Sequence, residues 1–393
     1  MKTLLTFNAG SSTVKIGLFA LHAGGPVRLA RGVIDFRHEP LTLRVSEGEQ
    51  RIEVALDARP DADLSGILSE TVAVLGRHFD LGEVAAVGHR VVHGGDHFAG
   101  PARLDRESIA AIEALTVLAP LHQPQSLRLI RAIGSVLPDL PQGASFDTAF
   151  HRTNDALVRR FAIPRAFHDR GIKRYGFHGL SYKYIAGELA RLAPEKAGGK
   201  VVVAHLGSGA SLCGLDNGIS RDTSMGFSTL DGIPMATRCG ALDPGVVLHL
   251  LGQEGLALRA MEDLLYHKSG LLGVSGISAD SRDLLESDAP EAREAIDLFA
   301  LRIAGEIARL AATLGGLDAV VFTAGVGENQ PKLRANVCGR LDWLGLDLDP
   351  IANAANAALI STPESRMAAF VIPTDEEQVI AEETVSLLGS AGK

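Results

Sequence analysis

Several arginine, histidine and aspartate side chains in this sequence stand beside glycine or proline, or directly after an apolar run. Arg90 lies in GHRVVHGG near the expected end of a strand, where a guanidinium can hold a carboxylate through two hydrogen bonds. Asp147 ends the apolar run of SFDTAF, so its burial requires a cation, a hydrogen-bond donor or a metal ion. Arg238 lies in the small-residue loop TRCGALDPG, before a helix expected to begin at Pro244. A lone arginine is more typical of a surface ion pair, so these positions gain meaning only together.

Histidines recur in segments whose backbone is constrained. His122 stands in PLHQP with a proline two residues to either side, and His178 follows a phenylalanine in RYGFHGLS. Taken singly, each fits a structural histidine better than a catalytic one. His89, His93 and His97 are spaced four apart, but a Gly-Gly pair before the last of them prevents a helix. The spacing therefore does not favour a three-histidine metal site.

Two short loops rich in glycine and serine each separate two apolar runs, NAGSST at residues 8–13 and HLGSGAS at residues 205–211. Neither matches GxxxxGK[ST] or GxGxxG, the patterns by which a loop before a helix binds phosphate. Both are expected to lead from strand to strand, so backbone amides and hydroxyl groups would have to hold an anion. Alone, either loop is more simply interpreted as a hairpin turn.

Three acidic residues, Asp375, Glu376 and Glu377, stand at an expected helix N-terminus, where capping and the helix dipole can account for them. Combined with the arginines, the histidines and the glycine loops, they gain a second interpretation. Phosphoryl transfer needs a Mg²⁺ position, cationic groups and alignment of the reacting groups, with little covalent chemistry from the protein. The combination therefore favours metal-assisted phosphate chemistry.

The elements that position these residues begin with strands. The first 65 residues contain the runs TLLTFN, VKIGLFAL, VRLARGVIDF, LTLRVS and RIEVALDA, which predict an antiparallel meander. Apolar residues then recur with a period near 3.6 and predict helices at 64–79, 105–118 and 124–137, interleaved with the strands VAAVGHRVVH and GASFDTAF.

The second half repeats this order. It opens with the strand KVVVAHL at residues 200–206 and continues with strands in SLCGLDNGISRDTS and a long helix at 290–314. DAVVFTAG is expected to be a buried strand ending in a Gly-rich loop, AAFVIPT a further strand, and residues 376–388 a terminal helix. The sequence therefore predicts a duplicated α/β domain with mixed sheets, and a ligand cleft between the copies.

Length and composition set wider limits. The 393 residues exceed a single core of roughly 250–300 residues, so two cores are expected. The chain is 46% hydrophobic and 22% charged, as is typical of globular proteins. A net charge of −9, with no basic run longer than a dipeptide, gives no sign of a nucleic-acid partner. Cys213, Cys239 and Cys338 are too widely spaced for a zinc site or a disulfide framework, which favours reduced core thiols.

No apolar stretch reaches the roughly 18 residues of a membrane span. The first residues also lack the uninterrupted apolar run of a signal peptide. We therefore expect no membrane partner and a cytoplasmic location.

Ten segments, in order from residue 6 to residue 377, resemble the motifs of the acetate and propionate kinase family: TFNAGSSTVK, GHRVVHGG, APLH, FDTAFH, RYGFHGLS, HLGSGAS, DTSMGF, TRCGALDP, TAGVGEN and IPTDEE. The resemblance covers nearly the whole chain, and the set of motifs is specific. It places the chain in the superfamily of sugar kinases, actin and large heat-shock chaperones. It implies reversible transfer of the ATP γ-phosphoryl group to acetate, giving acetyl phosphate and ADP, in organic-acid metabolism and acetyl-CoA synthesis.

The same resemblance implies the fold and assembly. Two actin-like, ribonuclease H-like domains are expected, with an active-site cleft between them. The first would cover residues 1–149, completed by a C-terminal helix at about 379–393, and the second, nucleotide-binding domain would cover residues 150–378. The family also suggests a homodimer.

Roles for individual residues follow from the resemblance. Mg²⁺, which Mn²⁺ can replace, would bind Asn8 and Glu376. The catalytic residues would be Asp147 as the acidic group, His178 and Arg238 on the phosphoryl group in transfer, and His122 near the same phosphate. Acetate would contact Arg90 through its carboxylate and Val92, Leu121 and Phe177 through its methyl group. ATP or ADP would bind Lys15, Ser11, Ser12, His205, Leu206, Gly207, Ser208, Gly209, Asp280, Ser281, Arg282, Gly325, Val326, Gly327, Glu328 and Asn329.

Four residues depart from the usual motifs of the family. Ser208 replaces the Asn of HLGNG, Gln123 that of APLHNP and Asp375 that of TNEE, and Thr229 replaces a pocket proline of TPLEG. The first change puts a nucleotide contact in question. The last could shift the preference among acetate, propionate and longer acids, although one methylene is worth only about 1–3 kcal/mol in such a pocket.

Two alternatives remain beside an acetate kinase activity. The nearer one is an acyl kinase that prefers propionate or butyrate, and kcat/KM for the competing acids decides it. The other is a nucleotide-gated chaperone or filament protein of the same superfamily. Arg90, His178 and Arg238 argue against the latter, since a protein without an acyl acceptor does not need all three.

Overall fold

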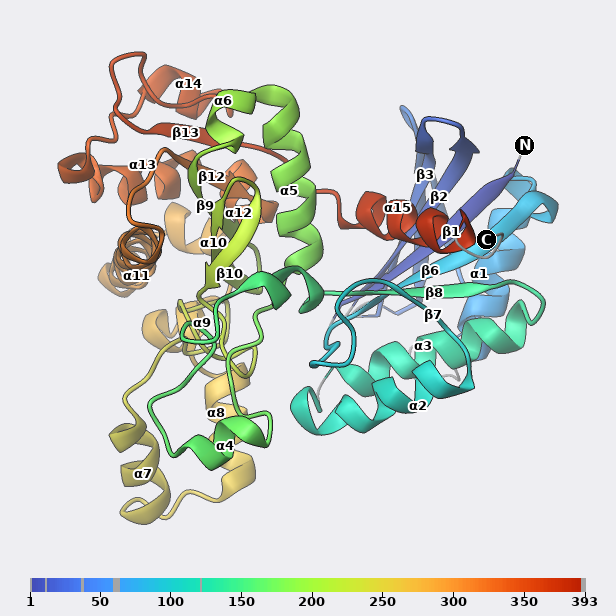
Figure 1. Ribbon diagram of the computed structural model, residues 1–393, viewed down its shortest axis with the longest axis horizontal. Helices are drawn as coiled ribbons and strands as arrows, with labels where there is room; N and C mark the ends of the chain where they lie inside the picture. Colours follow the sequence, from blue (N-terminus) through green and yellow to red (C-terminus); the bar gives the residue numbers. More distant parts are fainter. Residues whose placement is uncertain (1, 11–12, 37–38, 59–63, 121, 390–393) are drawn as a thin grey trace. The chain divides into compact units, whose positions relative to one another are not determined.

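The computed structural model describes residues 2–10, 13–36, 39–58, 64–120 and 122–389. Contacts within the chain divide it into two compact units. Unit 1 comprises Met1–Phe150 and Asp375–Lys393, and unit 2 comprises His151–Thr374. Each unit contains one mixed sheet with helices packed against it (Figure 1). The α/β architecture with two mixed sheets that the sequence predicts is therefore confirmed.

The sheet of unit 1 has the strand order β5-β4-β3-β2-β1-β6-β8-β7. Its strands are β1 (Thr3–Ala9), β2 (Thr13–His22), β3 (Gly25–Asp35), β4 (Thr42–Glu47), β5 (Gln50–Ala55), β6 (Val84–Val91), β7 (Ala102–Arg103) and β8 (Gln142–Phe146). The first five form the predicted antiparallel meander, whereas β6 runs parallel to both β1 and β8.

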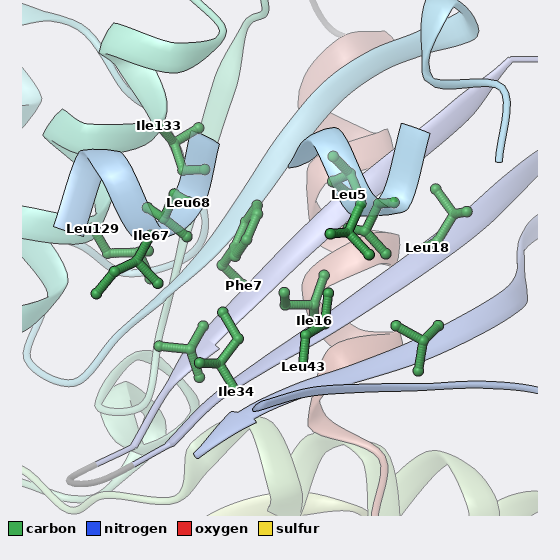
Figure 2. Packing of buried hydrophobic residues seen from close by; sticks show 14 of the residues in the cluster. Leu5, Phe7, Ile16, Leu18, Ile34, Leu43, Ile67, Leu68, Leu129 and Ile133 are labelled. Atoms are coloured by element: carbon green, nitrogen blue, oxygen red, sulfur yellow. The ribbon is translucent and has the colours of Figure 1, made fainter. Parts of the chain in front are cut away.

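Helices cover both faces of this sheet. They are α1 (Leu64–His78), α2 (Arg106–Ala114), α3 (Gln123–Val136) and α15 (Glu376–Gly389), with short 3₁₀ turns η1 (Leu81–Glu83) and η2 (Leu115–Leu118). On one face, Leu5 and Phe7 of β1 pack with Leu68 of α1 and Ile133 of α3 (Figure 2). On the other face, Leu4 belongs to a separate cluster that includes Ala381 of α15. β1 is buried on both faces, and its sequence TLLTFNA accordingly contains no charged residue.

Unit 2 repeats the strand order of unit 1. Its strands are β9 (Lys200–Leu206), β10 (Ala210–Asp216), β11 (Ile219–Thr223), β12 (Ala319–Thr323) and β13 (Ala368–Val371), in the order β11-β10-β9-β12-β13. This order corresponds to β3-β2-β1-β6-β8 of unit 1, with the same parallel and antiparallel pairings. The internal repeat expected from NAGSST and HLGSGAS is thus a repeat of topology.

The helices of unit 2 are α4 (Arg165–Asp169), α5 (Gly179–Leu192), α6 (Pro194–Ala197), α7 (Pro244–Gly252), α8 (Leu258–His267), α9 (Gly270–Ser275), α10 (Ser281–Glu286), α11 (Pro290–Leu314), α12 (Ala324–Asn329), α13 (Pro331–Gly339) and α14 (Pro350–Ala354). The 3₁₀ turns η3 (Ala149–Thr153) and η4 (Asp342–Leu344) complete the elements. The bounds of α11 are those predicted. Within the described residues, no helix is both long and apolar enough to cross a membrane.

One expected loop is a helix. The Gly-rich segment after β12 forms α12, which begins where Ala324 adopts a positive φ of 64°. The guanidinium of Arg334, fully buried, donates from Nη1 to the carbonyl oxygens of Gly327 (2.8 Å) and Glu328 (2.9 Å). These bonds satisfy carbonyl groups at the helix end that would otherwise lack partners.

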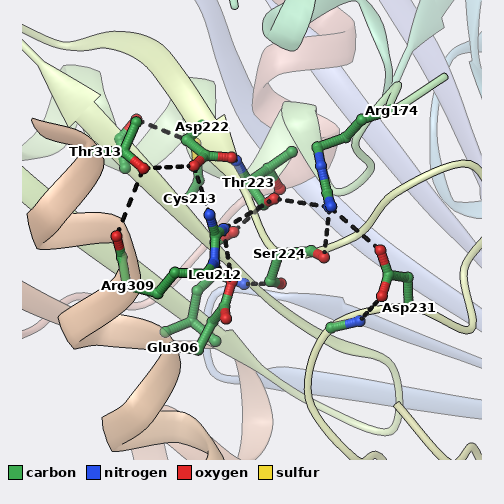
Figure 3. Close-up of polar contacts among 12 residues, drawn as sticks. Arg174, Leu212, Cys213, Asp222, Thr223, Ser224, Asp231, Glu306, Arg309 and Thr313 are labelled. Atoms are coloured by element: carbon green, nitrogen blue, oxygen red, sulfur yellow. Dashed lines mark hydrogen bonds and ion pairs between the residues drawn. The ribbon is translucent and has the colours of Figure 1, made fainter. Parts of the chain in front are cut away.

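Polar contacts hold β11 to α11, and Arg174 holds the loop that follows β11 (Figure 3). Asp222 on β11 is 2% exposed and accepts from Arg309 Nη1 at 2.7 Å and from Thr313 Oγ1 at 2.9 Å. Arg174 Nη1 donates to the carbonyl oxygen of Ser224 (2.9 Å) and to Asp231 Oδ2 (3.3 Å). The segment that precedes His178 is thereby fixed to the segment that precedes Arg238.

Close packing of α15 against the unit 1 sheet requires glycine on two paired strand positions. Gly88 of β6 is the register partner of Gly143 of β8. A Cβ on Gly88 would lie 2.3 Å from Thr384 Oγ1 and 2.7 Å from Ile380 Cγ2. A Cβ on Gly143 would lie 2.9 Å from Leu387 Cδ1.

We expect Gly88→Ala to lower the free energy of unfolding by about 1–3 kcal/mol, because the added methyl overpacks the contact with α15. Urea denaturation measures the change. Gly100→Ala is the matched control, since a Cβ there meets nothing within 4 Å. Equal stabilities of the two variants would contradict this account of α15.

Candidate active site

Three parallel strand ends in unit 1 bring predicted site residues together. Asn8 lies on β1, Arg90 on β6, and Asp147 directly after β8, and these strands are neighbours in the order β1-β6-β8. The carboxyl ends of adjacent parallel strands share one edge of a sheet, which is where ligand-binding residues of α/β folds gather. The wide separation of these residues in sequence thus becomes proximity in the fold.

Arg90 and Asp147 form a nearly buried ion pair. Arg90 Nε donates to Asp147 Oδ1 at 3.0 Å and Nη2 donates to Oδ2 at 2.6 Å, while Nη1 lies 3.2 Å from Asn8 Oδ1. The exposed side-chain fractions are 15% for Arg90 and 1% for Asp147. Burial opposes the charged guanidinium, but the Asp147 and Glu376 carboxylates raise the pKa of Arg90 above its ordinary value. The cation that buried Asp147 requires is therefore Arg90.

Two carboxylates of α15 converge on the amide of Asn8. Asn8 is 3% exposed, and its Nδ2 donates to Glu376 Oε2 and to Glu377 Oε1, both at 2.8 Å. Lys15 is the direct cross-strand partner of Asn8, so its exposed side chain projects from the same face of the sheet. Hydrogen bonds thus join Asn8 to Arg90, Glu376 and Glu377, whereas Lys15 is placed beside Asn8 by strand register.

The donor set of this network suits magnesium. Carboxylate and amide oxygens are the hard ligands that Mg²⁺ prefers, and Mg²⁺ usually combines one or two carboxylates with water and substrate phosphates. Over the described ranges, no group of three or more His, Cys, Asp and Glu side chains is arranged to hold a metal ion. The oxygen atoms of Asn8, Glu376 and Glu377 are of the type that Mg²⁺ prefers, but a metal ion here would need further ligands such as water or phosphate.

In unit 2, His178 and Arg238 converge on the turn between β9 and β10. An added Cβ on Gly209 would lie 3.4 Å from His178 Nε2 and 3.7 Å from Arg238 Nη1. The guanidinium of Arg238 is also fixed by a hydrogen bond, because its Nη1 donates to the carbonyl oxygen of Thr229 at 3.2 Å. Glycine at this position leaves room beside two nitrogen donors that were predicted to act on one phosphoryl group.

The His178 ring is fixed by its own surroundings. His178 precedes α5 with a left-handed backbone (φ 58°, ψ 24°), a conformation that most non-glycine residues avoid. Its ring stacks on that of His205, with centroids 4.3 Å apart and an interplanar angle of 17°. His205 is in turn bonded through Nδ1 to Ser181 Oγ at 2.8 Å. The side chain of His205 therefore supports His178.

His151, which sequence reasoning passed over, fixes the turn before His178. Burial lowers the pKa of His151 to about 4, so the ring is neutral, and its Nε2 lies 3.0 Å from the carbonyl oxygen of Phe177. The ring also packs on Gly176, where a Cβ would come within 2.5 Å of His151 Cδ2. The only sequence signal was its place at the end of the FDTAFH motif.

The predicted nucleotide residues that belong to unit 2 lie at two neighbouring strand ends and at one separate helix. His205 on β9 is the register partner of Thr323 on β12, so the turn at 207–209 and α12 lie at the same edge of the sheet. Asp280 caps α10 by accepting from Arg282 N at 2.9 Å, and its carboxylate also pairs with the Arg282 side chain. Gly325, Arg282 and Ser208 are exposed, whereas Leu206 is fully buried, so its side chain belongs to the core.

The remaining predicted residues are placed as follows. Val92 (4% exposed) and Phe177 (1% exposed) are buried in unit 1 and unit 2 respectively. His122 is half-buried and directly precedes α3. Ser11, Ser12 and Leu121 lie outside the described residues.

Comparison with known proteins shows the family to which the chain belongs. The sequence model of the acetokinase family matches residues 3–382. The chain belongs to the acetokinase family. It is 48% identical to an acetate kinase of Rhodopseudomonas palustris over 385 residues, covering 96% of each chain. It is 47% identical to an acetate kinase of Rhizobium meliloti over 392 residues, covering 99% of each chain.

Solved structures of acetokinase family members are also similar. A propionate kinase of Francisella tularensis matches with a TM-score of 0.91 and 34% identity, covering 98% of this chain and 99% of that one. An acetate kinase of Porphyromonas gingivalis matches with a TM-score of 0.87 and 34% identity, covering 99% and 100%. The similarity extends over essentially the whole length of each protein.

Two residues that differ from the usual motifs of the family, Asp375 and Gln123, form hydrogen bonds or ion pairs in this chain. Asp375 accepts from Gln378 N at 3.1 Å at the start of α15 and forms ion pairs with Arg28 and Arg31 of β3. Gln123 is fully buried, and its amide bonds both the backbone N and the carbonyl oxygen of His93. Asp375 thus joins α15 to the sheet by charge, which an asparagine there would not do.

Thr229 stands where the resemblance to the family expects a pocket proline. It is 9% exposed, and its contact with Arg238 uses the backbone carbonyl oxygen. A proline also has that carbonyl, so the support of Arg238 does not depend on the exchange.

We expect Arg90→Ala to destabilise the protein by about 3–5 kcal/mol, because Asp147 then stays buried without its cation. The double variant Arg90→Ala/Asp147→Ala should recover part of this loss in urea denaturation. Arg44→Ala breaks the exposed pair with Glu53 (56% and 64% exposed) and should cost under about 1 kcal/mol. A similar loss of stability in both single variants would contradict the prediction that burial makes the Arg90 pair more costly to break.

Proposed function

We propose that the chain is an acetate kinase. In the proposed reaction, a carboxylate oxygen of acetate forms a bond to the γ-phosphorus of ATP while the bond to the leaving ADP oxygen breaks, giving acetyl phosphate and ADP. The reaction is reversible. The observation that carries the proposal is the convergence of His178 Nε2 and Arg238 Nη1 on Gly209, in a chain of the acetokinase family.

The chemistry of in-line transfer explains why these groups suit the task. Negative charge spreads over the equatorial oxygens of the phosphoryl group, so fixed donors there stabilise the transition state more than the ground state. His178 and Arg238 supply such donors, and His122 assists near the same phosphate. Asp147 is the acidic catalytic residue in this proposal, and Arg90 binds the acetate carboxylate.

The hydrogen bonds that Arg90 already makes leave only part of its guanidinium available to acetate. Its Nε and Nη2 are bonded to Asp147, and its Nη1 donates to Asn8 Oδ1 and, at 3.4 Å, to the carbonyl oxygen of Ala9. A guanidinium has five N–H donors. Acetate would therefore share Arg90 with Asp147 or displace one of these bonds, and Val92, Leu121 and Phe177 would enclose its methyl group.

Mg²⁺ is the proposed metal ion, with Mn²⁺ as a substitute. Asn8 and Glu376 would hold it, and when bound it would neutralise charge on the nucleotide phosphates. Lys15, Ser11 and Ser12 would contact the same phosphates. The rest of the nucleotide would lie along residues 205–209, 280–282 and 325–329.

We propose that the protein acts in the cytoplasm as a homodimer. The helix α7 contains no buried residue, although its sequence PGVVLHLLG is largely apolar. Leu248 of α7 is 70% exposed and Leu258 of the adjoining α8 is 74% exposed. A second copy of the chain would cover this apolar surface, as a family homodimer requires.

Leu248→Glu should convert the protein to a monomer, because a buried unpaired carboxylate opposes association. Sedimentation velocity measures the change. Val117→Glu, at a site 80% exposed in unit 1, is the control that keeps the dimer. A monomeric wild-type protein would refute the proposed assembly.

Arg238→Ala should keep the fold and ADP binding but lower kcat on the order of 10³-fold or more, because a cationic donor to the transferred group is lost. A hydroxamate assay with ATP and acetate measures acetyl phosphate, and calorimetry measures ADP binding. Near-wild-type turnover in this variant would refute the role of Arg238.

The same assay tests the alternative of a propionate-preferring kinase. The comparisons do not favour it, because the relatives at 47–48% identity are acetate kinases and the Francisella tularensis propionate kinase is 34% identical. A higher kcat/KM for propionate than for acetate would favour it. Absence of any acyl phosphate with short-chain acids would reject both.

A further inference from the structure

Two buried hydroxyl groups form a chain of hydrogen bonds that ends at Nδ1 of His178, the ring nitrogen other than the proposed phosphate-facing Nε2. Ser211 and Tyr182 are both fully buried. Ser211 Oγ lies 2.8 Å from His178 Nδ1, and the Tyr182 hydroxyl makes a short hydrogen bond with the same Oγ. Ser211 therefore links the phenol of α5 to the imidazole at the start of that helix.

The direction of these bonds determines which ring nitrogen of His178 carries the proton. A serine hydroxyl has one proton to donate and two lone pairs to accept. If Tyr182 donates to Ser211 and Ser211 donates to His178 Nδ1, then Nδ1 is an acceptor, and the proton of a neutral ring resides on Nε2. In the reverse direction Nδ1 carries the proton, and Nε2 presents a lone pair.

For a neutral ring, only the first direction suits a phosphoryl group. Nε2 is the nitrogen on the side of Gly209, at 3.4 Å from an added Cβ there, close to Arg238 Nη1. Phosphoryl oxygens are acceptors, so a lone pair on Nε2 would repel them, whereas an N–H would donate to them. The stack with His205 and the left-handed backbone hold the ring in the orientation that this contact needs.

We propose that Tyr182 and Ser211 form a hydroxyl relay that fixes His178 as the Nε2–H tautomer, ready to donate to the transferred phosphoryl group. Both are positioning residues, because they act through His178. The inference rests on the proposed role of His178 in phosphoryl transfer and adds the residues that determine its protonation pattern.

Removal of Ser211 tests the relay. Ser211→Ala should lower kcat about 10- to 100-fold, since the ring loses the bond that selects its tautomer. KM for acetate and for ATP should change less than about twofold, because ground-state contacts are kept. Ser211→Thr keeps a hydroxyl and should retain more activity. Tyr182→Phe should also lower kcat, and the double variant Ser211→Ala/Tyr182→Phe should be no slower than Ser211→Ala.

The decisive comparison uses a His178→Ala background. There Ser211→Ala should have no further effect on kcat, because the residue through which it acts is gone. Thr223→Val is the matched control: it removes another buried hydroxyl, which donates to the carbonyl oxygen of Leu212 at 3.0 Å, and should leave kcat unchanged. Circular dichroism and thermal melting establish whether each variant is folded. If Ser211→Ala does not fold, Tyr182→Phe is used in its place.

Each contrary outcome has a separate meaning. Wild-type kcat in Ser211→Ala and Tyr182→Phe, together with a slow His178→Ala, would overturn the relay and keep the proposed function. An equal loss from Ser211→Ala with and without His178 would also overturn it. Wild-type kcat in His178→Ala would instead overturn the role of His178 itself.

Discussion

The ion pair between Arg90 and Asp147 is the interaction on which the organisation of unit 1 depends. A carboxylate with 1% exposure is costly in a protein interior unless a cation and hydrogen-bond donors accompany it. Arg90 meets that need and extends to Asn8, whose amide reaches the acidic residues at the start of α15. Charge balance among three strand ends and one helix thus fixes the polar edge of the sheet.

Unit 2 has the same strand order but gathers different chemistry at the corresponding edge. Carboxylates dominate the network of unit 1, whereas nitrogen donors converge on the turn after β9 in unit 2. The support in unit 2 is also different, since the Ser211 hydroxyl and the His205 imidazole contact His178 there. One topology therefore carries an acidic group suited to a metal ion and a donor group suited to phosphate.

Much of the fold could be predicted from the sequence, because apolar periodicity and turn residues are local signals. The meander at the start of the chain and the helix α11 follow directly from them. The segment after β12 was wrongly predicted as a loop, because Arg334, which bonds the carbonyl groups of its helix, also has partners far away in the sequence. The candidate site residues were predicted from motifs, but their pairings depend on strand order. Nothing local indicates that Asp375 meets Arg28, 347 positions away in the sequence.

The membership of α15 in unit 1 has a consequence for how the chain is made. Residues 376–389 pack on the sheet built from residues 3–146, yet the ribosome adds them only after it has completed all of unit 2. During synthesis, the face of the first sheet around Leu4 and Phe19 stays uncovered while the second sheet can already form. The acidic residues that meet Asn8 arrive last, so neither the covered sheet nor the proposed metal ligands exist before translation has passed residue 377.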